Sequence, residues 1–382
     1  MDTLRIENFG QIKSAEITFD DLTVFVGPQA SGKSVVLQLL KLAIDADAIQ
    51  TEMRRYGIDW DNNVGDFLDT YFGEGMRYLW KEKSTSIHWR SQLIDLRKVA
   101  KSRKSEEEEK LFFIPAQRAL TLRDGWPRPF GDYKPGDPFA VREFSEQLRV
   151  MLDWGTVGEH LFPSRHSMRK SFSTLLQRDL FSDYSLNIDK VSSQKRLVLG
   201  NNGLKTNLPF MVWSTGQREF IPLLLALYWL SPDKSTNCPS VEWVVLEELE
   251  MGLHPRAISV VLMLVFDLLA RGYKVCLSTH SPQVLDALWT LKHLRETKSK
   301  PEVLLEVFDV PKSAEMLKLA KSALTKTQKV HYFDRLSGTT RDISDLDPSS
   351  ENEDEADWGG LSEFSGRANQ AVAFAVANSN GH

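Results

Sequence analysis

Short apolar runs and longer runs with helical spacing alternate along this chain. Residues 22–26 (LTVFV) predict a buried strand, and the apolar spacing of residues 35–44 predicts a helix directly after it. Residues 241–246 (VEWVVL) and the start of residues 275–281 (VCLSTHS) predict two further buried strands. This alternation of strands and helices predicts an α/β fold built on a core sheet.

A glycine-containing turn, GPQASGKS at residues 27–34, joins the first strand to its helix and has the pattern G-x-x-x-x-G-K-S. Backbone N–H groups in such a loop wrap the phosphates of a nucleotide, and the helix N-terminus behind them favours negative charge. We expect Lys33 to reach the β- and γ-phosphates of ATP and the Ser34 hydroxyl to ligate Mg²⁺. The predicted nucleotide-binding residues of the loop are Gly27, Ala30, Ser31, Gly32, Lys33 and Ser34. The flanking strand and helix disfavour the alternative of a chance match.

Two carboxylates, Glu247 and Glu248, follow the strand predicted at residues 241–246. In open α/β sheets ligands bind at the carboxyl ends of the strands, and neighbouring strand residues point to opposite faces. We therefore expect Glu247 to hold Mg²⁺ and Glu248 to polarise the water that attacks the γ-phosphate. The alternative is an exposed acidic strand end without a chemical role.

A histidine stands at the corresponding place in the next predicted strand, residues 275–281, which ends in Thr279, His280 and Ser281. A lone histidine is more often structural than catalytic. Its position at a strand end, shortly after the glutamate pair, favours a catalytic imidazole beside the phosphates.

Together with IPAQR (residues 114–118), STGQRE (214–219) and LEELEMGLHP (246–255), these motifs resemble the ABC-type ATPases, in their RecF/SMC/OLD-like soluble branch. That branch includes AAA-15- and AAA-21-like ATPases of bacterial defence systems. Residues 4–34 resemble its amino terminus, where two antiparallel strands around an Asn-Phe-Gly turn precede the phosphate loop. The resemblance implies an ABC-ATPase head with a phosphate-loop core sheet, an N-terminal antiparallel β-subdomain and a helical signature lobe.

In ATPases of this kind two heads close face to face around two ATP molecules. The resemblance therefore implies a homodimer through an ATP sandwich. It implies that Ser214, Gly216 and Gln217 form the signature motif and act in trans, on the nucleotide of the other head. Glu250 and His254 would lie in the loop that crosses the dimer interface.

The loop after residue 114 resembles the Q-loop. The resemblance implies that Gln117 senses Mg²⁺ and the nucleophile, and that its neighbour Arg118 touches phosphate. Three positions depart from the family pattern. Glu247 replaces the usual Asp, which keeps the Mg²⁺-binding carboxylate on a longer arm. In the phosphate loop, Gln29 replaces an Asn and Ala30 replaces a Gly, so the loop has a negative φ at Ala30 or carries strain there.

The composition is that of a globular protein, with 42% hydrophobic and 26% charged residues among 382. Sustained heptads are lacking, so we expect no long coiled coil. We expect an ATPase domain at residues 1–340 with an inserted helical lobe at about 45–205, an acidic linker at 341–357 and a C-terminal interaction segment at 358–382. The last segment docks on a partner or on the second head, or else folds back on its own domain.

The two cysteines, the polar N-terminus and the short apolar runs predict a cytoplasmic protein without membrane contact. A net charge of −5 provides no general attraction to nucleic acid. The basic cluster within residues 93–110 is either a nucleic-acid patch or a solvated turn, so DNA stays open as a partner. Residues 186–203 predict a hairpin with Asn201-Asn202-Gly203 as its turn.

Three functions are compatible with these observations. The first is a dimeric switch ATPase that controls a separate effector, a nuclease or toxin, in a bacterial defence-type system. The second is a RecF-like ATPase of DNA repair, in which closure of the dimer grips DNA. The third is a nucleotide-gated scaffold with little hydrolysis, which the presence of both Glu248 and His280 disfavours.

Overall fold

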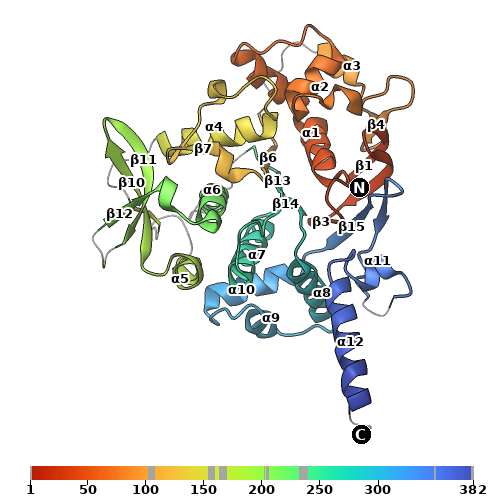
Figure 1. The fold of residues 1–382 in the computed structure, drawn as a ribbon, viewed down its shortest axis with the longest axis vertical. Coiled ribbons are helices and arrows are strands. Elements are labelled where there is room, and N and C mark those ends of the chain that lie inside the picture. The colour runs from red at the N-terminus through yellow and green to blue at the C-terminus, as the bar shows by residue number, and fades with distance from the viewer. Residues whose placement is uncertain are drawn as a thin grey trace.

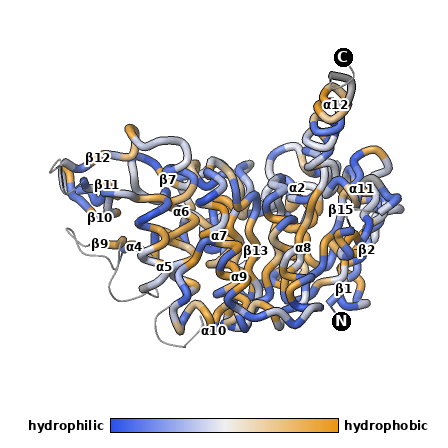
Figure 2. Tube along the Cα trace, turned by 90° about the horizontal axis from the view of Figure 1, so that it is seen from below, coloured by the Kyte–Doolittle hydropathy of each residue, from blue (hydrophilic) through white to orange (hydrophobic). Residues whose placement is uncertain are grey.

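The computed structural model describes residues 2–101, 108–153, 160–162, 170–201, 203, 206–231, 240–347 and 350–379. A large central sheet with helices on both faces forms the body, and a smaller β-lobe lies to one side of it (Figure 1). The C-terminal helix projects away from the body (Figures 1 and 2).

Within the described residues, ten strands form the central sheet. In order across the sheet they are β5 (Gln92–Leu93), β4 (Ser86–Trp89), β1 (Asp2–Phe9), β2 (Ile12–Phe19), β16 (Thr339–Asp342), β15 (Gln328–Asp334), β3 (Leu22–Val26), β14 (Lys274–Ser278), β13 (Trp243–Leu246) and β6 (Leu111–Ile114). The last five strands in that order are parallel, whereas β1 and β2 form an antiparallel pair. The predicted α/β fold, its three buried strands and its antiparallel N-terminal pair are confirmed.

The parallel strands β6 and β13 are apolar throughout because both of their faces are covered. Val244 and Leu246 of β13 face the core that includes α7 (Pro255–Ala270) and α8 (Pro282–Glu296). Trp243 and Val245 face the opposite core, which includes α1 (Lys33–Arg55) and α2 (Val64–Phe72). Successive strand residues point to opposite faces, so one uninterrupted apolar run serves two cores.

The described residues form further helices. They are η1 (Met76–Leu79), α3 (Leu96–Lys101), η2 (Arg118–Thr121), η3 (Phe130–Asp132), α4 (Phe139–Asp153), α5 (Lys170–Leu176), η4 (Gln177–Phe181), η5 (Phe210–Val212), α6 (Thr215–Leu230), α9 (Pro301–Val307), α10 (Ala314–Ala323), α11 (Glu353–Ala356) and α12 (Glu363–Ser379). None of the helices within the described ranges combines the length and apolar character needed to cross a bilayer.

The hairpin predicted at residues 186–203 is wrong in the position of its turn. Its sheet has the order β12 (Thr206–Pro209), β11 (Gln194–Asn201), β10 (Tyr184–Val191) and β9 (His160–Phe162), and a separate pair consists of β7 (Leu122–Arg123) and β8 (Trp126–Pro127). The turn between β10 and β11 is formed by Ser192 and Ser193, with φ values of 48° and 69°. Two successive positive φ values satisfy a type I′ turn, which serine can adopt at some cost. Asn201 instead ends β11, and Asn202 lies outside the described residues.

Residues 341–346 pack on the body, and α12 extends away from it. Residues 341 and 342, the first of the predicted acidic linker, belong to β16, and the side chains of Ile343 and Leu346 are buried. By contrast, the side chains of α12 up to residue 376 are exposed, with Phe374 72% exposed. This part of the predicted interaction segment therefore does not fold back on its own domain.

In the basic cluster predicted within residues 93–110, residues 102–107 lie outside the described ranges.

Candidate nucleotide-binding site

The parallel strands bring four loops to one edge of the sheet. Ser278 of β14 pairs with Phe25 of β3, and Leu246 of β13 pairs with both Leu277 and Ile114. Because these strands end at the same level, the segments that follow them meet at the carboxyl edge. The phosphate loop, the glutamate pair, the His280 segment and the Q-loop segment therefore lie together, as the sequence predicts.

The phosphate loop needs an unusual backbone at three positions. Gly27 and Gly32 have φ values of 136° and 104°, and a side chain at Gly27 would collide with the carbonyl oxygen of Phe333. Ala30 has φ 59°, so it adopts the left-handed conformation despite its Cβ. Of the two outcomes expected for Ala30, the structure shows the strained one, at a cost of about 1–2 kcal/mol.

Lys33 is folded against its own loop. Its Nζ donates hydrogen bonds to the carbonyl oxygens of Gly27 at 2.7 Å and Pro28 at 2.8 Å, and its residue is only 6% exposed. Burial lowers the pKa of Lys33 to about 8, while Glu248 and Glu250 counteract part of that shift. The ammonium group is thus poorly solvated and held by two neutral carbonyls. An anionic phosphate would stabilise its positive charge better than these carbonyls do.

Glu247 combines burial with an open coordination position. It is 4% exposed, its Oε2 accepts a hydrogen bond from the Ala116 N–H at 3.2 Å, and its buried Oε1 has no partner among the described residues. Burial raises its pKa to about 7, opposed by the nearby Ser34 hydroxyl and the Ala116 N–H. A buried carboxylate beside a hydroxyl is the hard oxygen donor set that Mg²⁺ prefers, so the residues present fit this ion.

No group of three or more His, Cys, Asp or Glu side chains that could hold a metal occurs in the described part of the chain.

Glu248 and His280 face each other. Glu248 has φ 45°, its N–H donates to the Ser278 hydroxyl at 3.2 Å, and its Oε1 lies 3.7 Å from Nε2 of His280. Burial and the positive charge of Lys33 lower the pKa of His280, against the opposing effect of Glu248. The imidazole is therefore mainly neutral at pH 7. A non-glycine residue with positive φ is strained by about 1–3 kcal/mol, and such strain is common at active sites.

Arg118 corrects the expectation that it touches phosphate. Its side chain is fully buried, at 0% exposure, and its guanidinium donates to the carbonyl oxygens of Glu219, Pro115, Glu247 and Glu248. All of these acceptors are backbone oxygens that tie the Q-loop to the end of β13 and to α6. Arg118 is therefore a structural clasp of the site, while the neighbouring Gln117 is exposed at the start of η2.

The predicted signature motif begins α6 as expected. Ser214 is the N-cap, its Oγ accepts a hydrogen bond from the Gln217 N–H at 3.2 Å, and the Gln217 side chain accepts one from the Ser214 N–H at 2.9 Å. This reciprocal pair is a capping box. A Cβ on Gly216 would lie 2.6 Å from the carbonyl oxygen of Gly252, so glycine is required for this close approach.

Glu250 makes contacts within its own head, while its place at a dimer interface stays a prediction. Its carboxylate accepts hydrogen bonds from the Thr279 hydroxyl at 3.0 Å and from the His280 N–H. His254 is the N-cap of α7, where its Nδ1 accepts from the Arg256 N–H at 3.3 Å. Sequence reasoning missed the Glu250 contact and that of Ser278. The only signal for either was a run of hydroxyl side chains at the end of β14.

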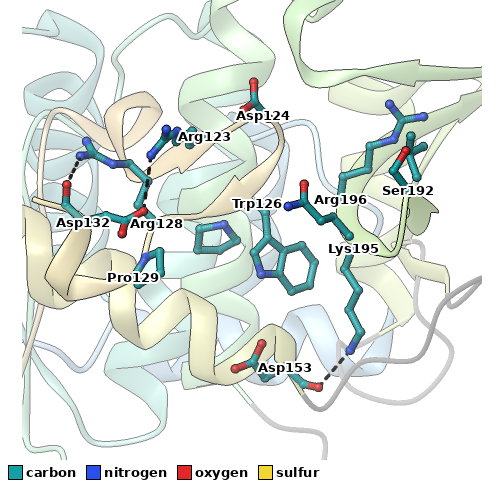
Figure 3. A pocket seen from close by; sticks show the side chains of 13 residues that line it. Arg123, Asp124, Trp126, Arg128, Pro129, Asp132, Asp153, Ser192, Lys195 and Arg196 are labelled. Carbon is teal, nitrogen blue, oxygen red and sulfur yellow. Dashed lines mark hydrogen bonds and ion pairs between the residues drawn. The ribbon is translucent and has the colours of Figure 1, made fainter.

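A separate cavity of 780 Å³ lies beside the β-lobe (Figure 3). It is lined by side chains from the β7–β8 pair, residues 128–132, the end of α4 and the β10–β11 hairpin. Several of its charged groups are already paired, since Arg123 meets Asp132 at 3.4 Å and Lys195 donates to the Asp153 carbonyl oxygen at 3.1 Å.

Two family models match the chain, and they divide the site between them. A model described as "AAA ATPase domain" matches residues 1–114, which contain the phosphate loop. A second, described as "AAA domain, putative AbiEii toxin, Type IV TA system", matches residues 153–286, which contain the signature segment, the glutamate pair and His280. Both matched segments are thus similar to AAA-type domains.

Solved structures of low sequence identity are similar to this chain. The SMC head domain from Thermotoga maritima is 12% identical, with 74% of this chain and 90% of that one covered and a TM-score of 0.33. An SMC head bound to the C-winged helix domain of ScpA is 11% identical, with 89% and 95% covered and a TM-score of 0.41. The protein cbiO1 from Clostridium perfringens, part of the ABC transporter complex cbiONQ, is 14% identical, with 89% and 88% covered and a TM-score of 0.34. No curated protein sequence matches this chain.

Proposed function

We propose that this protein binds and hydrolyses Mg·ATP in a dimer of two heads, and that closure of the dimer is a switch controlling a separate effector. The observation that carries the ATPase proposal is the meeting of Lys33, Glu247 and the Glu248–His280 pair at one edge of the sheet. These residues follow three different strands, β3, β13 and β14, and each has a distinct task in phosphoryl transfer.

The binding half of the site consists of the phosphate loop and Glu247. Lys33 would exchange the carbonyl oxygens of Gly27 and Pro28 for phosphate oxygens, and the free N–H groups at the start of α1 would cradle the same anion. Ser34 and Glu247 would hold Mg²⁺. When bound, this ion would neutralise charge that develops on the phosphate oxygens.

The hydrolytic half consists of Glu248 and His280. The Glu248 carboxylate would accept a hydrogen bond from the attacking water and orient it toward the γ-phosphorus. The neutral imidazole of His280, 3.7 Å from that carboxylate, would donate a hydrogen bond to the γ-phosphate. The bond from the γ-phosphorus to its bridging oxygen then breaks, ADP leaves, and the proton of the water ends on inorganic phosphate.

The dimer is proposed from the signature segment. Ser214 lies exposed at the N-terminus of the 16-residue helix α6, where backbone N–H groups and the helix dipole attract anions. Its Oγ accepts from Gln217, which leaves the hydroxyl hydrogen to donate to a phosphate. We assign this donor to the γ-phosphate bound by the second head, with Gly216 and Gln217 shaping the approach.

The effector is proposed from the family match. The model that covers residues 153–286 carries the words "putative AbiEii toxin, Type IV TA system" in its description. This supports a role in a bacterial defence-type system, in which the ATPase controls a nuclease or toxin.

Nucleotide binding and steady-state hydrolysis test the ATPase proposal. We expect Lys33→Ala to lose ATP binding, and Glu248→Gln to bind ATP normally while turnover falls about 100-fold or more. Glu306→Gln is a matched control, since that exposed side chain pairs with Lys312 far from the site in sequence. Hydrolysis by Glu248→Gln at the wild-type rate would overturn the catalytic assignment. A DNA affinity that rises with ATP and falls with salt would instead favour the DNA-clamping alternative.

A further inference from the structure

The segment that follows Glu248 folds back beneath the end of β14. Its Glu250 carboxylate accepts two hydrogen bonds there, one at each oxygen: Oε2 from the Thr279 hydroxyl and Oε1 from the His280 N–H. Thr279 is fully buried, and its own N–H donates to the Phe25 carbonyl oxygen at 3.1 Å. The carboxylate thus holds the backbone from which the His280 ring extends.

The same segment also contacts the signature helix. Residues 248–253 are closed by two short-range hydrogen bonds, from the Met251 N–H to the Glu248 carbonyl oxygen at 3.1 Å and from the Leu253 N–H to the Glu250 carbonyl oxygen at 2.9 Å. Gly252, at φ 71°, presents its carbonyl oxygen to Gly216 at the start of α6. One compact turn therefore touches α6 on one side and the end of β14 on the other.

We propose that Glu250 is a positioning residue that acts within its own head, where it fixes His280 against Glu248 and links that pair to the signature helix. A displacement of α6 would move Gly252 and with it the Glu250 carboxylate. The two hydrogen bonds would pass that displacement to the backbone of His280. The kinetic part of this inference rests on the proposed ATPase function, whereas the structural link does not.

The two bonds make different demands on the residue at position 250. Both partners donate, so only a carboxylate accepts from both of them. Glu250→Gln keeps one acceptor, which the His280 N–H can use, while the Thr279 hydroxyl can turn and accept from the amide. Glu250→Leu keeps the approximate volume and removes both acceptors. Since each variant loses the charge near Lys33, the difference between them isolates the hydrogen bonds.

Amide hydrogen exchange of the nucleotide-free protein tests the link without any need for activity. In Glu250→Leu we expect exchange in residues 275–283 to become about tenfold faster or more, because the His280 N–H loses its acceptor. Residues 22–26 of β3 should keep their wild-type exchange rates. In Glu250→Gln, the exchange rate of residues 275–283 should lie between those of Glu250→Leu and the wild type. Unchanged exchange across residues 275–283 in Glu250→Leu would overturn the proposal.

Steady-state kinetics test the consequence for catalysis. A misplaced catalytic group costs about 100-fold in rate, so we expect kcat to fall about 100-fold in Glu250→Leu and about tenfold in Glu250→Gln. KM for ATP should change less than about threefold, since the phosphate loop is intact. A fall in ATP affinity with unchanged kcat would contradict the positioning role. If the wild type itself hydrolyses no ATP, the proposed function fails, and the exchange experiment still decides on the link.

Discussion

Replacing Arg118 by Met tests whether this side chain is a structural clasp or a phosphate ligand. Arg118 donates to four carbonyl oxygens, at 2.8 Å to Glu247, 3.1 Å to Glu248, 3.2 Å to Glu219 and 3.3 Å to Pro115. At about 1 kcal/mol net for each bond, the loss is about 4 kcal/mol. Removal of the buried charge offsets part of this loss in stability, because burial disfavours the charged guanidinium and lowers its pKa.

We therefore expect Arg118→Met to reduce the free energy of unfolding by about 3 kcal/mol, a large fraction of the stability of a typical domain. The assay is urea unfolding of the nucleotide-free protein, followed by tryptophan fluorescence and compared at constant m-value. Arg123→Met is the matched control. That side chain is 67% exposed and makes one ion pair of 3.4 Å with Asp132, so its loss should cost less than about 1 kcal/mol.

A second readout separates the two roles of Arg118. The clasp holds the carbonyls of Glu247 and Glu248, so its loss should slow hydrolysis while the phosphate loop still binds ATP. An Arg118→Met protein with wild-type stability and a weakened affinity for ATP would refute the structural role. Such a result would support the alternative role of Arg118 as a phosphate ligand.

Three further outcomes are expected. Mg·ATP affinity should be greatest between about pH 7 and 8, because Glu247 is protonated below its raised pKa of about 7 and Lys33 loses its charge above its lowered pKa of about 8. A flat affinity profile from pH 6 to 9.5, measured with a fluorescent ATP analogue, would contradict this. Ser193→Gly should raise the free energy of unfolding by about 0.5–1 kcal/mol in urea titrations, because Ser193 has φ 69° and glycine tolerates that conformation. Gly216→Ala should destabilise the protein by about 1–3 kcal/mol in the same assay, since the new Cβ meets the Gly252 carbonyl oxygen at 2.6 Å, whereas Gly131→Ala has open space and should not.

The parts of the site that were predictable from the sequence are those with a local cause. A glycine loop between a strand and a helix, or a pair of carboxylates after an apolar run, has its geometry determined within about ten residues. The phosphate loop, the Glu247–Glu248 pair and the Ser214 N-cap accordingly lie where the pattern places them.

The parts that could not be predicted depend on contacts between distant segments. Arg118 has the same neighbours in sequence whether it points to a phosphate or to the end of β13, and only the packed fold decides. The two hydrogen bonds of Glu250 join residues about 30 positions apart. Likewise β15 and β16 enter the central sheet between β2 and β3, although part of their sequence is polar and reads locally as a linker.

The proposed switch requires that two heads close on ATP, and the mass of Glu248→Gln in solution tests this most directly. Light scattering would be recorded with and without Mg·ATP at several protein concentrations, and Glu248→Gln combined with Lys33→Ala would serve as the control that cannot bind nucleotide. We predict a monomer without nucleotide and a dimer with Mg·ATP, with no shift in the control. A mass that does not change with Mg·ATP would contradict ATP-driven closure between two copies of this chain and, with it, the action of Ser214 in trans.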